Sequence, residues 1–186
     1  MAACGVLLLP DWRDAGCGHW LSRWEARPGY MRVQQHDWAH PRRGDWCARL
    51  QDVLLDQPQP VALAAHGLGC ILVAWWAAHT RHADRVRGAL LVAPTDVERP
   101  DLREHLPGWA PIARQRLPFP STVVASTDDA WGSASQAAAL AAAWGSALTL
   151  AGARGHLDAD SGLGDWPEGL ALLQPLCEGA GPRKAA

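Results

Sequence analysis

The sequence predicts a three-layer α/β fold, in which helices cover both faces of a mostly parallel sheet. Six short runs are apolar almost throughout, as strands buried on both faces require. They cover residues 5–9, 31–34, 61–65, 88–92, 122–126 and 147–150. Segments with helical patterns alternate with these runs, at residues 19–26, 45–55, 69–79, 133–144 and 166–178. This alternation is typical of βαβ units with right-handed crossovers.

Length and charge limit the class of protein. The 186 residues fit one domain, predicted for residues 1–178, with a polar, small-residue-rich tail at 179–186. The formal net charge of -2, with acids and bases interspersed, argues against a nucleic-acid or membrane partner. No apolar stretch approaches the roughly 20 residues that span a bilayer, and the first apolar run is too short for a signal peptide. We therefore expect a soluble cytoplasmic protein.

Cysteine and tryptophan usage adds two expectations. The five cysteines are odd in number, widely spaced and without a CxxC pair, which predicts reduced thiols and neither disulfides nor a metal site. No cofactor motif is present. The eleven tryptophans are expected to fill the core and the seams between helices and sheet.

Residues 95–120 interrupt the alternation. Five prolines in this segment exclude a regular helix or central strand. A long irregular segment in a compact domain is usually a lid or a binding loop. A surface connection without a role is the equal alternative.

Candidate functional residues directly follow the predicted strands. Ligands of open parallel sheets bind outside the carboxyl ends of the strands. Asp11 and Trp12 follow the first run, Asp128 and Asp129 follow the fifth, and His156 follows the sixth. An acid and then a histidine at one edge of a sheet is an arrangement that serves catalysis.

The turn after the third run has the layout of the nucleophile elbow of α/β-hydrolases, a tight strand-to-helix turn. Ala65 and Gly69 are the two small flanking residues that such a turn requires. His66, in one of the variable positions, is expected to be structural. Gly67 stands at the centre, where a serine, cysteine or aspartate normally projects.

Several long strings in the sequence carry a family resemblance. They include His19-Trp20-Leu21-Ser22-Arg23-Trp24-Glu25, Ala65-His66-Gly67-Leu68-Gly69-Cys70, Leu117-Pro118-Phe119-Pro120-Ser121 and Ala125-Ser126-Thr127-Asp128-Asp129. On these strings the chain resembles the retinoblastoma-binding protein 9 family of small serine hydrolases. The resemblance implies a single-domain α/β-hydrolase fold and esterase-like hydrolysis of a small acyl substrate.

The resemblance also implies roles for individual residues. Position 67 should carry the serine nucleophile, Asp129 should be the acid and His156 the base. The backbone N–H groups of Leu68 and Trp12 should form the oxyanion hole. Asp11 stands where the family usually has glycine, which places a carboxylate near the point where negative charge would develop.

Gly67 has no side-chain atom, so covalent catalysis through this position is impossible and acyl hydrolysis should be absent or severely impaired. Either the protein is a degenerate hydrolase that keeps its pocket as a ligand- or protein-binding module, or glycine replaces serine in an active enzyme. A third reading has His156, oriented by Asp129, activating water directly. A fourth makes Cys70 the nucleophile, although Cys70 should face the core.

Overall fold

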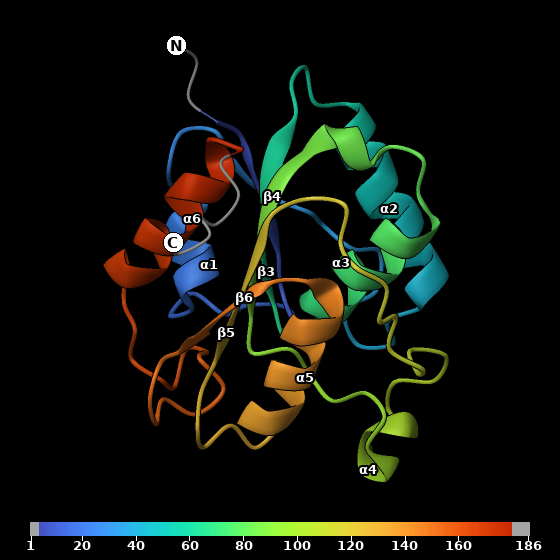
Figure 1. Ribbon diagram of the computed structural model, residues 1–186, viewed down its shortest axis with the longest axis vertical. Coiled ribbons are helices and arrows are strands. Elements are labelled where there is room, and N and C mark those ends of the chain that lie inside the picture. Colours follow the sequence, from blue (N-terminus) through green and yellow to red (C-terminus); the bar gives the residue numbers. More distant parts are fainter. Residues whose placement is uncertain (1–3, 180–186) are drawn as a thin grey trace.

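The computed structural model describes residues 4–179 as a doubly wound α/β domain built on one six-stranded sheet (Figure 1). All strand pairs are parallel and the order is β2-β1-β3-β4-β5-β6. The strands are β1 (Val6–Leu9), β2 (Tyr30–Arg32), β3 (Val61–His66), β4 (Val86–Val92), β5 (Ser121–Ala125) and β6 (Ala147–Leu150). The predicted fold class is therefore confirmed.

Helices cover both faces of this sheet (Figure 1). The helices α1 (Trp20–Trp24) and α6 (Pro167–Cys177) lie on one side, and α2 (Arg43–Leu55), α3 (Leu68–His79) and α5 (Ala134–Trp144) lie on the other. A short helix, α4 (Pro100–Arg103), and one 3-10 turn, Ala83–Arg85, complete the regular structure. The predicted helices are all present, with ends shifted by a few residues.

Helix starts differ from the sequence prediction where a side chain caps the helix. His19 precedes α1, and its Nδ1 accepts a hydrogen bond from the Leu21 N–H. Ser133 precedes α5 and accepts from the Gln136 N–H. Both residues satisfy a backbone donor that the first helical turn leaves unpaired, so each stands just before its helix instead of inside it.

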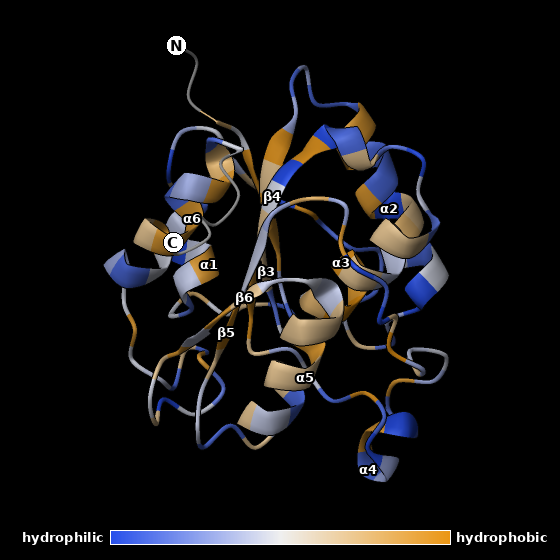
Figure 2. Cartoon of the chain, viewed as in Figure 1, coloured by the Kyte–Doolittle hydropathy of each residue, from blue (hydrophilic) through white to orange (hydrophobic). Residues whose placement is uncertain are grey.

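Two hydrophobic clusters, one on each face of the sheet, stabilise the domain. Figure 2 shows the apolar residues concentrated along the strands and on the helix faces that meet them. Seven of the eleven tryptophans are buried, which confirms the expected core role for most of them. They are Trp20, Trp24 and Trp166 on the side of α1 and α6, and Trp46, Trp76, Trp109 and Trp144 on the side of α2, α3 and α5.

The irregular segment 95–120 is anchored to the domain. Leu106 and Trp109 are buried in the larger cluster, and the Trp109 indole N–H donates to the Pro41 carbonyl over 2.9 Å. The segment also reaches the carboxyl edge of the sheet, where Thr95 and Leu106 line a cavity described below. These contacts favour a structural wall over a detached surface connection.

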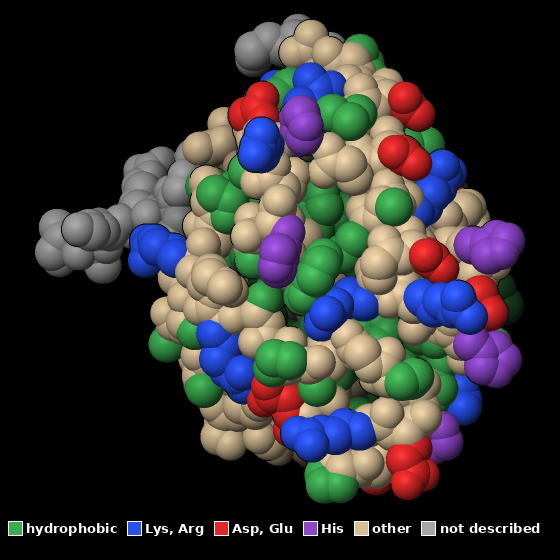
Figure 3. Space-filling model, turned by 90° about the vertical axis from the view of Figure 1, so that its right-hand side faces the viewer, with side chains coloured by type: hydrophobic (Ala, Val, Ile, Leu, Met, Phe, Trp, Pro, Cys, Tyr) green, Lys and Arg blue, Asp and Glu red, His purple; other side chains and the backbone are tan. Residues whose placement is uncertain are grey.

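Other sequence expectations concern the surface and the ends of the chain. Figure 3 shows positive and negative side chains interspersed on the face that it displays. Among the helices of residues 4–179, none combines the length and apolarity needed to cross a bilayer. The predicted tail lies outside the described residues, except for Gly179.

Candidate active site

The strand register brings the predicted residues to one edge of the sheet. Leu9 of β1 pairs with Ala65 of β3, and His66 pairs with Val92 of β4. Ala125 of β5 pairs with Leu150 of β6. The loops that follow β1, β3, β5 and β6 therefore all leave the sheet at its carboxyl edge.

The turn between β3 and α3 has the tight geometry that the sequence predicts. Gly67 has φ 55° and ψ -118°, a conformation that L side chains rarely adopt. A Cβ on Gly69 would lie 2.4 Å from the Leu9 carbonyl oxygen, so only glycine fits there. The close approach of α3 to β1 thus requires glycine at position 69.

The loops after β5 and β6 bring Asp129 and His156 into contact. His156 Nδ1 lies 2.9 Å from both carboxylate oxygens of Asp129, whose side chain is 1% exposed. The neighbouring Asp128 instead accepts from the Gly155 N–H over 2.8 Å and from the Ser126 hydroxyl over 2.7 Å. Asp129 therefore orients the imidazole, while Asp128 shapes the loop that carries it.

The carboxylate of Asp11 fills the space in which a side chain at position 67 would lie. A Cβ built on Gly67 would be 2.1 Å from Asp11 Cγ. Asp11 Oδ1 accepts from the Leu68 N–H over 2.5 Å and from the Trp12 N–H over 2.7 Å. These are the two donors that the resemblance assigns to an oxyanion hole, and the structure brings them together on one oxygen.

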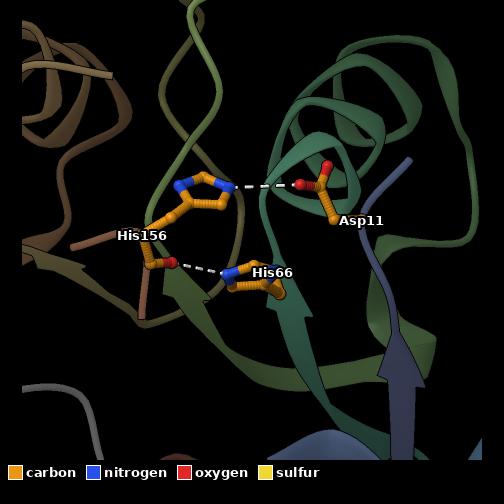
Figure 4. A group of neighbouring side chains, drawn as sticks. All are labelled: Asp11, His66 and His156. Atoms are coloured by element: carbon orange, nitrogen blue, oxygen red, sulfur yellow. Dashed lines mark hydrogen bonds and ion pairs between the residues drawn. The ribbon is translucent and has the colours of Figure 1, made fainter. Parts of the chain in front are cut away.

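The other oxygen of this carboxylate faces the histidine. Asp11 Oδ2 lies 3.1 Å from His156 Nε2 (Figure 4). His156 thus lies between two carboxylates, Asp129 at Nδ1 and Asp11 at Nε2. The sequence identifies Asp11 as unusual but does not reveal this contact, because the loop conformation decides where the side chain points.

Burial and hydrogen bonding act in opposite directions on these groups. Burial disfavours the imidazolium form of His156, but the hydrogen bonds to Asp11 and Asp129 outweigh it and raise its pKa to about 9. Burial raises the pKa of Asp11, but the hydrogen bond to His156, nearby histidines and the Leu68 N–H give a net lowering. At neutral pH the site therefore holds an imidazolium between two carboxylates.

This protonation state bears on the hypothesis that His156, oriented by Asp129, activates water directly. A general base must offer a lone pair, and both nitrogens of an imidazolium carry protons. His156 is consequently unable to activate water while Asp11 remains a carboxylate beside it. Direct water activation is disfavoured in the resting site.

Two further histidines lie buried beside the site. His66 Nε2 is 2.8 Å from the His156 carbonyl oxygen, which can only accept, so His66 carries its proton on Nε2 (Figure 4). His19 Nδ1 accepts from the Leu21 N–H, so its proton is on Nε2. Burial lowers the pKa of His66 and lowers that of His19 to about 2, which keeps both neutral. His66 thus has a structural part in the site, since it holds the backbone of His156.

A cavity of about 190 Å³ opens beside the Asp11 carboxylate. Within residues 4–179, the buried atoms His19 Nε2, His66 Nδ1 and Thr95 Oγ1 lack hydrogen-bond partners. All three residues line this cavity. The remaining wall is Asp11, Trp12, Arg13, Asp14, Leu106, Trp131, His156 and Asp158.

Asp11, His66 and His156 also have donor atoms within 4.8 Å of one another, which is the donor set of a possible metal site. Two of the three atoms are already joined by the hydrogen bond between Asp11 and His156. That bond accounts for their spacing without an ion. The prediction that the protein needs no metal stays a prediction.

Cys70, the fourth reading's nucleophile, points into the core. Its side chain is fully buried in α3, and its Sγ lies 3.3 Å from the Val92 carbonyl oxygen. Burial raises the pKa of this thiol well above its usual value. A protonated, inaccessible thiol is inert as a nucleophile.

The sheet order, the elbow and the carboxylate–histidine pair define an α/β-hydrolase fold. The chain matches the serine hydrolase family over residues 6–175, and it belongs to this family. No curated protein matches the chain.

Solved structures share the fold of this chain. A protein of Pectobacterium atrosepticum described as a YdeN-like hydrolase is 29% identical, with a TM-score of 0.83 over 97% of this chain and 94% of that one. The ydeN gene product of Bacillus subtilis is 22% identical, with a TM-score of 0.75 over 94% and 99% of the two chains. The type II thioesterase BorB from the borrelidin cluster, at 20% identity and a TM-score of 0.60, covers 96% and 92%.

Proposed function

We propose that this chain is a member of the serine hydrolase family in which serine-dependent ester hydrolysis is lost and a carboxylate–histidine centre replaces it. The position of the Asp11 carboxylate carries this proposal. It lies in the space of the absent nucleophile side chain, 2.1 Å from where a Cβ of residue 67 would be. Gly67 and Asp11 therefore act as a matched pair.

Asp11 also obstructs acyl chemistry at the oxyanion hole. Hydrolysis of an ester through a tetrahedral intermediate needs free N–H donors for the developing oxyanion. The Leu68 and Trp12 donors are both engaged by Asp11 Oδ1. A substrate carbonyl would have to displace this oxygen and place its own negative charge beside a carboxylate.

The inherited cavity supports a small-molecule ligand as the partner of this site. Its unpaired His19 and Thr95 atoms are polar groups that a ligand can satisfy. We further propose, from the motif strings, that the chain lies close to the retinoblastoma-binding protein 9 branch of the family. The five free cysteines support a reducing compartment such as the cytoplasm.

Restoring the serine tests the proposal through four proteins: the natural chain, Gly67→Ser, Asp11→Gly and the double variant. A fluorophosphonate probe, which labels activated serines, should mark only the double variant. Gly67→Ser alone should remain unlabelled, because its Cβ meets the Asp11 carboxylate. Aryl-ester hydrolysis by the double variant should exceed that of the natural chain by roughly a thousandfold or more, since losing a triad serine costs on the order of a millionfold.

His156→Ala in the double variant is the control and should abolish labelling, while circular dichroism verifies that each protein folds. Equal labelling of Gly67→Ser and the double variant would contradict the obstruction by Asp11. An unlabelled but folded double variant would contradict the claim that only these two positions separate the chain from serine chemistry.

A further inference from the structure

We infer that Asp11 is a nucleophile toward small epoxides, which it opens by forming an ester through its own carboxylate. The inference rests on the proposed function, because it assigns a substrate class to the same carboxylate–histidine centre. Carboxylates serve as covalent nucleophiles in several enzyme classes. The geometry of Asp11 matches what each half of such a reaction requires.

The first requirement is an accessible, oriented carboxylate oxygen. Asp11 Oδ1 is held by the Leu68 and Trp12 N–H groups, and Oδ2 carries one hydrogen bond, from His156. The side chain is 21% exposed and lines the cavity, so Oδ2 retains lone-pair density for attack. The cavity of about 190 Å³ is well above the volume that one water molecule needs, so it has room for a small epoxide.

The second requirement is a donor for the epoxide oxygen. Ring opening breaks a C–O bond and leaves negative charge on that oxygen. His19 carries its proton on Nε2, which is unpaired, and the Thr95 hydroxyl is also unpaired. Both residues are only 4% exposed and line the cavity that Asp11 lines. A buried donor without a partner is costly, and an ether oxygen would relieve that cost.

The third requirement is hydrolysis of the ester formed on Asp11. Water must add to Cγ, which places negative charge on Oδ1. This oxygen already accepts hydrogen bonds from two backbone N–H groups, which would stabilise the oxyanion. In most hydrolases this hole awaits a substrate oxygen, whereas here it holds the oxygen of the enzyme's own ester. The engagement that obstructs acyl substrates therefore favours this step.

The fourth requirement is a base that appears only after the first step. Attack of Oδ2 forms the new C–O bond and breaks one C–O bond of the ring. The freed oxygen accepts hydrogen bonds from His19 and Thr95 and is protonated by the His156 imidazolium, the one acid among these groups. His156 is then neutral, because esterification removes the carboxylate that stabilised its charge, and Asp129 continues to orient it. A neutral Nε2 can accept a proton from the attacking water.

The cycle closes with all atoms and protons balanced. His156 takes a proton from water as the oxygen adds to Cγ, and it returns that proton to the alcohol that leaves. Asp11 is released as the acid and passes its proton to His156, which restores the resting ion pair. The net reaction is epoxide plus water to a vicinal diol, without any other reactant.

The test uses glycidol, a small epoxide, with the natural chain, His156→Gln and Asp11→Asn. The Asp11 ester should accumulate in His156→Gln, with an occupancy roughly tenfold or more above the natural chain, because its hydrolysis lacks a base. Asp11→Asn should form no adduct at position 11. Peptide mass spectrometry measures the occupancy, and the other carboxylates in the same digest report non-specific alkylation. Asp165→Asn, at an exposed site outside the cavity, is the matched control and should behave as the natural chain.

A second measurement needs no variant. The natural chain turning over glycidol in heavy-oxygen water should carry the heavy isotope in the Asp11 carboxylate, because water attacks Cγ and not the substrate carbon. If only the diol carries the heavy isotope and a chelator abolishes turnover, the nucleophile is a metal-bound water. That result would overturn the inference.

Adducts spread over surface carboxylates, or no adduct and no turnover at all, would also overturn it. These results are separable from the proposed function. If the double variant Asp11→Gly with Gly67→Ser is labelled by the serine probe but Asp11 is never alkylated, the loss of serine chemistry stands and the epoxide inference fails.

Discussion

The two halves of the site differ in how far they depart from a serine hydrolase. In the histidine half, Asp129 contacts His156 Nδ1 at 2.9 Å, as a working member requires. In the nucleophile half, position 67 carries glycine, and the Asp11 carboxylate, from the loop after β1, lies in the space of a residue-67 side chain. The histidine half thus has the contact that serine hydrolysis needs, and the nucleophile half has a carboxylate in place of a serine side chain.

In the nucleophile half, two positions far apart in the sequence form one structural unit. Gly67 leaves the room that Asp11 occupies, and the start of α3 supplies an N–H for its charge. A helix N-terminus stabilises a carboxylate, so the hydrogen-bonding needs of Asp11 Oδ1 are met in this position. Reversing either change alone breaks that unit.

The largest expected effect beyond the serine experiment is on stability. Gly67→Ala should lower the free energy of unfolding by about 3 kcal/mol, because it overpacks Asp11 and imposes a strained backbone on alanine. With Asp11→Gly present, the same change should cost about 1 kcal/mol, since only the backbone strain remains. Urea denaturation of the four proteins measures this coupling.

Equal costs in both backgrounds would mean that Asp11 moves aside freely, and the two positions would no longer form a unit. Asp11→Gly alone separates this coupling from the loss of the Asp11 hydrogen bonds.

A second, smaller effect is the pH dependence of stability. The folded-state pKa of His156 is about 9, above its unfolded value near 6.5. Between these values the unfolded chain releases the proton that the folded chain keeps, so stability should fall as pH rises. The contribution is fully present below about pH 6.5 and lost through about pH 9. Urea denaturation across this range measures the decline.

The same denaturation series on Asp11→Asn separates the effects of Asp11 and Asp129 on the pKa of His156. Without the Asp11 charge, only Asp129 stabilises the imidazolium, so the decline should still begin at about pH 6.5 but end at a lower pH. Nuclear magnetic resonance titration of His156 should report the same downward movement of its pKa. An unchanged titration would show that Asp129 alone sets the proton affinity of His156.

The histidine half could be predicted because strand order brings its residues to one sheet edge and the family resemblance gives their roles. Asp129 and His156 follow strands that pair in parallel, so their loops must leave the same sheet edge. The tight turn after β3 could also be predicted, because every such turn leaves room only for small residues at its two flanks, here Ala65 and Gly69. The resemblance names Asp129 as the acid, and the loop geometry brings Asp129, not Asp128, into contact with His156.

The nucleophile half was not accessible in the same way. The sequence marks Asp11 and Gly67 as departures, but their coupling depends on a side-chain direction that no periodicity encodes. The unpaired Nε2 of His19 was missed for a similar reason. Only the hydrogen bond from the Leu21 N–H to Nδ1 fixes the proton of His19 at Nε2, on the cavity side.

The smallest expected effect concerns Cys70, which lies in the first turn of α3, three residues after Gly67 of the nucleophile half. If the nucleophile half depends only on Asp11 and Gly67, Cys70→Ala should leave the glycidol adduct on Asp11 unchanged. Removing one buried sulfur should cost about 1 kcal/mol of stability, because the cavity it leaves is small. Mass spectrometry and urea denaturation measure the two effects. Loss of the adduct in a folded Cys70→Ala protein would place the thiol in the chemistry, against its burial and its contact with the Val92 carbonyl.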